Sequence, residues 1–162
     1  MAALKIRNFC APDDLAQIER LVSAVVQECY GHLIQDYRFD VEEDWPSSWL
    51  AEIEGEIVGV MLTKRDWLED LWIARHQRRL GIGAQLLRIG EREIAGRGHK
   101  LGKFRVVADN LQAKRFYARH GWIEDCHYPH EVNGFGMVDM VKGLETFQRG
   151  SSQRPGTGPG LA

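Results

Sequence analysis

The fold of this chain is decided by residues 66–98, DWLEDLWIARHQRRLGIGAQLLRIGEREIAGRG. Residues 67–73 form a short run that ends in aromatic and branched side chains, which predicts a β-strand. Beyond them apolar residues recur at helical spacing, so a helix is expected to open at Gly81-Ile82-Gly83. A strand that enters a helix through a glycine turn directs unpaired backbone N–H groups and the positive end of the helix dipole at one place. Such a place binds phosphate.

This turn can be compared with three phosphate-binding patterns. The dinucleotide fingerprint G-x-G-x-x-G/A begins at Gly81 and Gly83, but its third small residue falls on Leu86. A P-loop requires Gly-Lys-Ser or Gly-Lys-Thr, and the chain contains neither. The third pattern, R-x-x-G-x-G, is present at residues 78–83 as RRLGIG, and its arginines add positive charge. The turn therefore favours a pyrophosphate cradle of the third kind.

A second block, residues 104–122, reads FRVVADNLQAKRFYARHGW. With both blocks in this order, the chain resembles the GNAT superfamily of acyl-CoA N-acyltransferases, whose main signature is R-x-x-G-x-G between a fourth strand and a third helix. The second block is similar to the family's fifth strand and fourth helix, V-x-x-x-N-x-x-A-x-x-F/L-Y-x-x-x-G-F/W. The matching positions are Val106 or Val107, Asn110, Ala113, Phe116, Tyr117, Gly121 and Trp122. The resemblance covers most of residues 3–143.

The resemblance implies an α/β (α+β) fold with a mixed, mostly antiparallel, twisted sheet of about six to seven strands. About four helices are expected to flank it, and strands 4 and 5 to splay apart. Besides 67–73, strands are expected at residues 4–8, 49–53, 56–63, 104–107, 122–125 and 136–142, and helices at 12–30, within 31–47, after Gly81 and at 111–120. Residues 1–147 are expected to form a single acyl-CoA N-acyltransferase domain. Residues 148–162 are rich in Gly, Pro and Ser and are expected to form a tail.

The composition, with 44% hydrophobic and 27% charged residues among 162, is typical of a soluble globular protein. The net charge of −2 argues against general nucleic-acid binding. The N-terminus lacks the apolar stretch of a signal peptide, and no apolar run approaches the ~18 residues that span a bilayer. The three cysteines form no C-x-x-C, and the histidines are not at metal-ligand spacing. We therefore expect no nucleic-acid or membrane partner, no metal and a cytoplasmic location.

The resemblance also implies that acetyl-CoA, or coenzyme A, is the cosubstrate. The residues expected to bind it are Leu71, Trp72, Ile73, Arg78, Arg79, Leu80, Gly81, Ile82, Gly83, Ala84, Asn110, Ala113, Phe116 and Tyr117. Gly81 and Gly83 matter because a Cβ would keep phosphate oxygens away from the backbone. In the family the acyl-pantetheine arm inserts between the splayed strands, and its carbonyl meets a main-chain N–H at Ile73 or a neighbour. Asn110 can cap the following helix as well as bind that arm.

Acyl transfer to a lysine-like amine requires the amine to lose a proton, because its pKa is ~10.4. Glu69 and Asp70 lie on the strand before the turn, and strand alternation places Glu69 on the face of Leu71 and Ile73. Several members of the resembled family use an acid at the position of Glu69. We therefore expect Glu69 as the base, with Asp70 as the alternative. Either carboxylate could instead be structural, be solvated or bind the positive charge of a substrate.

Tyr117 matches the family's tyrosine that lies beside the sulfur and protonates the leaving thiolate. A phenol with a pKa of ~10 is protonated at pH 7 and suits a general acid, although packing alone would also explain Tyr117. The expected function is an N-acetyltransferase that moves an acetyl group from acetyl-CoA to a primary amine by direct attack, through a tetrahedral intermediate. The alternatives are a catalytically silent acyl-CoA-binding module that regulates a partner, and a nucleotide-dependent enzyme that uses the same cradle.

The acceptor is expected to be a small amine or a peptide amine. The segment 31–47 carries the acidic residues Asp36, Asp40, Glu42, Glu43 and Asp44. They could attract a cationic amine or simply form a solvated loop. Aromatic side chains that could stack on an aromatic amine are Tyr37, Phe39, Trp45 and Trp49. Neither class of acceptor is favoured, and a homodimer is compatible with the resemblance.

Overall fold

The computed structural model of the protein describes residues 2–41 and 44–145, so the expected tail at 148–162 lies outside the described residues. The strands are β1 (Leu4–Asn8), β2 (Trp49–Ile53), β3 (Glu56–Lys64), β4 (Trp67–Ile73), β5 (Leu101–Val107), β6 (Ile123–Pro129) and β7 (Gly136–Gly143). The helices are α1 (Pro12–Tyr30), α2 (Ile82–Gly96) and α3 (Leu111–Arg119), with 3₁₀ turns η1 (Trp45–Ser47) and η2 (Arg75–Gln77). The strands form one sheet in the order β1-β2-β3-β4-β5-β7-β6. Neighbouring strands in the sheet are antiparallel except β4 and β5, which are parallel. This confirms the predicted mixed, mostly antiparallel sheet.

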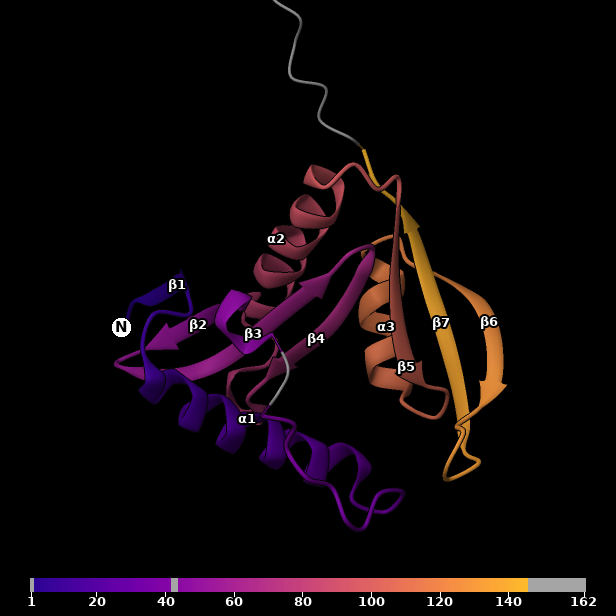
Figure 1. Ribbon diagram of the computed structural model, residues 1–162, viewed down its shortest axis with the longest axis horizontal. Coiled ribbons are helices and arrows are strands. Elements are labelled where there is room, and N and C mark those ends of the chain that lie inside the picture. The colour runs from indigo at the N-terminus through magenta and orange to yellow at the C-terminus, as the bar shows by residue number, and fades with distance from the viewer. Residues whose placement is uncertain (1, 42–43, 146–162) are drawn as a thin grey trace, which may run out of the picture.

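Different helices cover the two faces of this sheet (Figure 1). α1 packs on one face, where the buried cluster includes Ile18, Val22, Val25, Val26, Leu50, Val60 and Leu62. α2 and α3 pack on the other face, where the cluster includes Met61, Leu68, Leu86, Leu87, Val106, Tyr117, Trp122 and Met140. β3 contributes to both clusters and is buried from Ile57 to Thr63, as expected for a central strand.

The segment 31–47 differs from the prediction. Within the described residues it contains no α-helix, and three α-helices rather than about four flank the sheet. Trp45 is buried, donates its indole N–H to the carbonyl of Asp40 at 2.8 Å, and stacks on Phe39 with ring centroids 5.2 Å apart. One buried tryptophan therefore anchors this segment, and no helical repeat of apolar residues was available to do so.

Two strand ends also differ from the prediction. β5 begins at Leu101 rather than at residue 104, and β6 extends to Pro129 rather than to residue 125. Both extensions pair with β7, as Leu101↔Gly143 and Pro129↔Gly136. Partners far along the chain set these ends, and such partners leave no local signal in the sequence.

The expected separation of β4 from β5 is present. The two strands pair only as Trp67↔Lys103 and Leu68↔Phe104. Beyond these pairs they diverge, as Figure 1 shows. Antiparallel pairing continues on their outer edges, to β3 and to β7. The sheet therefore opens in its middle and stays continuous on either side.

A β-bulge accompanies the point of divergence. The β3–β4 register passes from Leu62↔Asp70 to Thr63↔Leu68, so Glu69 is the extra residue of β4. The bulge shifts the alternation of faces between the residues of β4 before it and those after it. Leu68 joins the cluster beneath α2, on the same face as Leu71 and not on the face of Asp70. Simple alternation along the strand could not predict this change.

A buried ion pair ties β1 to α1. Arg7 donates to both carboxylate oxygens of Asp14, at 2.8 and 2.9 Å, and through Nε to Glu52 at 2.7 Å. The Asp14 carboxylate also accepts the backbone N–H groups of Cys10 and Ala11, where the helix begins. These hydrogen bonds, the ones from Arg7 foremost, hold the pKa of Asp14 well below its usual range, although burial alone would raise it.

Replacing Asp14 by Asn should destabilise the fold at neutral pH by about 3 kcal/mol, because the guanidinium of Arg7 would lose its charged partner. Since the pKa of Asp14 is depressed in the folded state, its stabilisation is complete above the unfolded pKa of ~3.9 and is lost as the pH falls toward the folded pKa. The difference in unfolding free energy between parent and variant should therefore shrink below about pH 4. Urea unfolding at several pH values measures this difference.

Asp13→Asn is the matched control, because Asp13 is an exposed carboxylate one residue earlier. It should change the unfolding free energy by no more than about 0.5 kcal/mol. A parent–Asp14→Asn difference that stays constant from neutral to acid pH would contradict this role of the carboxylate.

Candidate active site

The turn at residues 78–83, hereafter the 78–83 turn, joins β4 through η2 to α2. Arg79 and Gly81 have φ angles of 66° and 81°, in the left-handed region. Glycine adopts this conformation freely, whereas for arginine it costs of order 1 kcal/mol, a strain found often at ligand-binding turns. The first N–H after the turn that donates to a carbonyl is that of Gln85, to Gly81 at 3.1 Å. In residues 2–41 and 44–145, no backbone carbonyl accepts the N–H groups of residues 79–84.

Gly83 lies against the side chains of Phe116 and Ile73. A Cβ added at this position would lie 3.4 Å from Phe116 Cζ and 3.6 Å from Ile73 Cγ1, which are ordinary contact distances. The fold by itself would therefore accommodate alanine here. Glycine leaves room for a ligand atom to approach the backbone, and together with the N–H groups of the turn it fits a phosphate group.

The side chain of Arg78 is used within the protein. Its two terminal nitrogens donate to the carboxylate of Glu28 at 2.7 and 3.1 Å, and its Nε donates to the carbonyl of Ile73 at 3.1 Å. Arg78 therefore ties the end of α1 to the end of β4. Arg79 is exposed at the cleft, and α3 adds Arg115 and Arg119 to the same lining. The exposed positive charge that lines the cleft therefore comes from these three arginines, because Arg78 is paired with Glu28.

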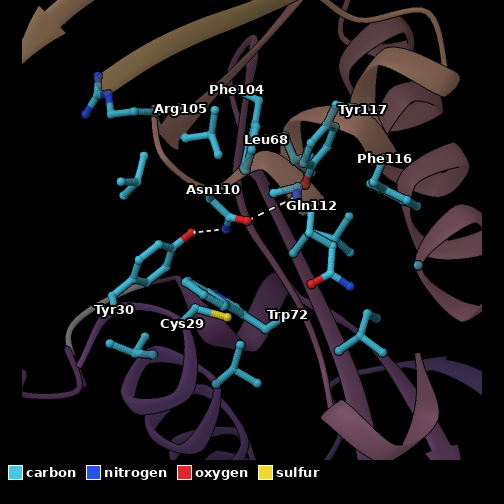
Figure 2. Close-up of a pocket in the computed structure, with 18 of the residues that line it drawn as sticks. Cys29, Tyr30, Leu68, Trp72, Phe104, Arg105, Asn110, Gln112, Phe116 and Tyr117 are labelled. Atoms are coloured by element: carbon cyan, nitrogen blue, oxygen red, sulfur yellow. Dashed lines mark hydrogen bonds between the residues drawn. The ribbon is translucent and has the colours of Figure 1, made fainter. Parts of the chain in front are cut away.

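A cleft of about 1490 Å³ opens where β4 and β5 part, hereafter the β4–β5 cleft. The C-terminal end of α1, the N-terminal end of α2 and the helix α3 complete its walls, as Figure 2 shows. The predicted cosubstrate-binding residues that line it are Leu71, Trp72, Ile73, Arg78, Arg79, Gly81, Gly83, Ala84, Asn110, Ala113, Phe116 and Tyr117. Leu80 and Ile82 do not line it, because Leu80 points to solvent at 66% exposure and Ile82 is buried in the core. Ile82 can therefore offer a ligand only its backbone, whereas the side chain of Leu80 lies in solvent outside the cleft.

Tyr117 projects from α3 between the aromatic side chains of the cleft. Its ring stacks on Phe104 of β5 with centroids 4.2 Å apart and meets Phe116 and Trp122 edge to face. Figure 2 shows Tyr117 and Phe116 on the same side of the cleft. Burial raises the pKa of Tyr117 well above its usual range, and the negative potential of Tyr30 and Asp70 adds to that rise. The hydroxyl therefore stays protonated at any ordinary pH.

Asn110 connects the two sides of the β4–β5 cleft. Its Oδ1 accepts the N–H of Ala113 at 3.1 Å, as an N-cap of α3. Its Nδ2 donates to the hydroxyl of Tyr30, at the end of α1, at 2.7 Å (Figure 2). The Tyr30 ring also packs edge to face with Trp72. Burial raises the pKa of the Tyr30 hydroxyl. Tyr30 was not predicted from the sequence, because a tyrosine at the end of a helix carries no local signal of its distant partner.

The two candidate bases have different surroundings. Glu69, at the bulge, is exposed and lines the cleft. Its pKa is raised by partial burial first and by the charge of Asp70 second, while Arg105 opposes the rise. Asp70 is 8% exposed, does not line the cleft, and accepts the indole N–H of Trp72 at 2.7 Å. The geometry therefore makes Glu69 accessible to a ligand and gives Asp70 a structural hydrogen bond.

In the described part of the chain, no helix is both long and apolar enough to cross a membrane. The same residues contain no group of three or more His, Cys, Asp or Glu side chains that could hold a metal ion.

The family model for the acetyltransferase (GNAT) domain matches residues 17–144. The chain belongs to the GNAT acetyltransferase family. An uncharacterised N-acetyltransferase of Methanocaldococcus jannaschii, MJ1530, is 32% identical over 102 residues, which are 58% of this chain and 64% of that protein. This chain thus spans just under two thirds of the length of the curated relative that it matches.

Solved structures share the fold of this GNAT domain. Ard1 from Thermoplasma volcanium superposes with a TM-score of 0.74 and 19% identity, over 88% of this chain and 99% of that chain. The PaiA N-acetyltransferase from Thermoplasma acidophilum was solved in complex with coenzyme A. It superposes with a TM-score of 0.66 and 15% identity, over 88% of this chain and 99% of that chain. At these identities the likeness concerns the fold alone.

In this GNAT domain, the hydrogen bond between Tyr30 and Asn110 should make the two residues energetically coupled. Tyr30→Phe removes the acceptor, and Asn110→Ser removes the Nδ2 donor while it keeps a capping oxygen. A double-mutant cycle of unfolding free energies should give a coupling of about 0.5–1.5 kcal/mol. Strictly additive effects of the two changes would show that the bond does not contribute in solution.

Proposed function

We propose that this protein is an acetyl-CoA-dependent N-acetyltransferase that acts on a primary amine by direct attack. The observation that carries the proposal is the β4–β5 cleft, which joins an amide-lined turn at one end to an exposed carboxylate at the other. Family membership supports N-acetyl transfer in general terms. The choice of acetyl donor, the chemical steps and the residue roles are our inferences from the site.

The turn and the cleft fit the two parts of coenzyme A. Unpaired N–H groups of residues 79–84 at the start of α2 would hold the pyrophosphate, with Gly83 leaving room for its oxygens. The facing edges of β4 and β5 beyond Leu68 and Phe104 lack each other as partners, so they present backbone groups to the amides of the pantetheine arm. When bound, the cosubstrate supplies an acetyl thioester whose carbonyl carbon is open to attack by an amine.

Tyr117 would donate a hydrogen bond to the sulfur as negative charge develops there. A thiol has a pKa of ~8.5, whereas burial holds the pKa of Tyr117 well above 10. Complete proton transfer from Tyr117 to a free thiolate would therefore be uphill. Donation of a hydrogen bond is favourable, because the site is apolar and the donor is already in place.

Glu69 would accept a proton from the incoming amine, directly or through water. The carboxylate is exposed at the bulge, on the wall of the β4–β5 cleft. Its raised pKa makes it a stronger base than an ordinary glutamate and brings its titration closer to neutrality. Asp70 supports it by holding the indole of Trp72 and by raising the pKa of Glu69.

Coenzyme A and acetyl-CoA should both raise the melting temperature of the protein. At a ligand concentration of 100 times Kd, the free energy of unfolding should rise by ~2.7 kcal/mol. Gly83→Ala should weaken this binding by roughly tenfold or more, because a Cβ would occupy the space for the phosphate oxygens. Isothermal calorimetry with coenzyme A measures the affinity.

Gly96→Ala is the matched control, since it lies at the other end of α2 and its added Cβ would meet no atom within 4 Å. It should leave the affinity for coenzyme A unchanged. Equal affinities for the parent protein and Gly83→Ala would remove the turn from the binding site. Stabilisation by ATP or NAD, and not by coenzyme A, would indicate a nucleotide-dependent enzyme instead.

Glu69→Gln and Tyr117→Phe should each lower kcat by about 10²-fold at neutral pH, and they should differ in how this deficit depends on pH. The deficit of Glu69→Gln should shrink as the pH approaches the amine pKa of ~10.4, because the amine then loses its proton without help. The deficit of Tyr117→Phe should persist, because the raised pKa keeps Tyr117 protonated throughout. Release of free thiol across a panel of amines measures kcat.

Glu56→Gln, an exposed change at the start of β3, is the control and should have no effect. Binding of acetyl-CoA without acetylation of any amine by the parent protein would favour the silent binding module. Deficits with the same pH dependence would contradict the separate roles of the two residues.

A further inference from the structure

Arg105 on β5 lines the β4–β5 cleft and lies beside Asp139 on β7, with which it forms a charged pair. The residues on either side of Arg105 and Asp139 pack into the core cluster beneath α2 and α3. Strand alternation therefore turns Arg105 and Asp139 to the opposite face of the sheet. They are direct partners in the β5–β7 register, and Arg105 lines the cleft. Figure 2 shows Arg105 on the side of β5 away from Tyr117.

Two aromatic rings hold the guanidinium of Arg105. It lies 5.1 Å from the centroid of the Trp67 ring and 6.0 Å from that of Tyr128. The Tyr128 hydroxyl in turn donates to Asp139 at 2.6 Å. The shortest contact between Arg105 and Asp139 joins Nε to Oδ1 at 3.6 Å, which is longer than a hydrogen bond. The ion pair is therefore loose, and cation–π contacts with the two rings add to it in positioning the guanidinium.

The Arg105 side chain is 57% exposed, so a ligand in the cleft can reach it. Glu69 lines the same cleft and carries the opposite charge. Burial and the charge of Asp70 raise the pKa of Glu69, and the nearby charge of Arg105 lowers it. An exposed carboxylate and an oriented guanidinium on one cleft match a ligand that carries an ammonium and an anionic group. A guanidinium presents a planar fork of donors that suits a carboxylate.

We propose that the acceptor is an amino acid-like compound whose amine faces Glu69 and whose carboxylate is bound by Arg105. This inference rests on the proposed acetyl transfer and deepens it by naming the class of acceptor. A polyamine fits less well, because its second ammonium would lie beside Arg105 and would be repelled.

Acetyl transfer to such an acceptor would release coenzyme A and one proton. The ammonium first loses one proton to Glu69 and then to solvent. The neutral nitrogen forms a bond to the acyl carbon, and the carbon–sulfur bond breaks with its electron pair on sulfur. The second nitrogen proton is released, and the thiolate takes up one proton. The products are an N-acetyl amino acid and the free thiol of coenzyme A, with one net proton released.

The test compares acceptors that differ only in their anionic group. The probes are ω-amino acids of increasing chain length, each assayed beside its carboxamide, with release of coenzyme A thiol as the readout. For at least one length, kcat/KM should favour the carboxylate by roughly tenfold or more. The length at which this occurs gives the span between the amine and Arg105.

Two variants show whether Arg105 binds the carboxylate of the acceptor or only forms a structural ion pair with Asp139. Arg105→Met should bring the carboxylate-to-carboxamide ratio to about one, because any effect on catalysis through the pKa of Glu69 would act on both acceptors alike. Asp139→Asn should raise the ratio, because Arg105 would no longer share its charge with a neighbour. Lys103→Met is the matched control, since Lys103 lies over the same Trp67 ring at 5.7 Å but outside the cleft lining. It should leave the ratio unchanged.

The possible outcomes are distinct. A parent protein that acetylates amines without a preference for the carboxylate would overturn the role of Arg105 and leave acetyl transfer intact. Arg105→Met and Asp139→Asn acting alike on both acceptors would mean that the pair is only structural, and would also overturn it. No thiol release with any amine, despite stabilisation by coenzyme A, would contradict acetyl transfer itself and this inference with it.

Discussion

The structure depends on how little of β4 and β5 pairs. The two strands start together, because the N–H of Lys103 donates to the carbonyl of Asp66 at 2.9 Å and its ammonium pairs with the same residue at 3.0 Å. After two residue pairs the strands part, and their facing edges lack each other as partners. Unpaired backbone groups inside a sheet are costly unless water or a ligand satisfies them. An extended ligand with its own amide groups is a natural partner for such edges, so the opening itself favours a pantetheine arm.

Side chains from distant parts of the chain line this opening and bridge it. The stacked rings of Phe104 and Tyr117 fill the side toward α3. On the side toward α1, Tyr30 reaches across to Asn110. The same Asn110 caps α3, so the helix that carries Tyr117 and the helix that ends at Tyr30 are linked through one amide group. A ligand that uses Asn110 must therefore replace or join the bond to Tyr30, which couples binding to the position of α1.

The parts of the site that sequence predicted are those built by neighbours in the chain. The 78–83 turn follows directly from its glycines, and Asn110 caps the helix that begins one residue later. The segment 31–47 was predicted wrongly, because the burial of Trp45 outweighs local preference there. The bulge at Glu69 depends on the register with β3, which no local pattern reveals.

Residues joined across long distances also escaped sequence analysis. Tyr30 meets Asn110 from 80 positions away, and the side chain of Arg78 pairs with Glu28 from 50 positions away. A motif indicates which residue types form a turn, but it does not indicate which distant residues their side chains contact. For Arg78 the motif predicted the turn in which the residue lies, but not the pairing of its guanidinium with Glu28 of α1.

The β4–β5 cleft is lined by both charged and aromatic side chains. Arg79, Arg115, Arg119, Glu69 and Arg105 line it together with Phe104, Phe116 and Tyr117. Tyr117 lies against the rings of Phe104 and Phe116, and its burial raises the pKa of the hydroxyl. That burial weakens Tyr117 as an acid, since its anion is poorly stabilised. It strengthens Tyr117 as a hydrogen-bond donor, because a bond to developing charge is stronger where water is excluded. These aromatic surroundings therefore suit a tyrosine that would stabilise a leaving group without giving up its proton.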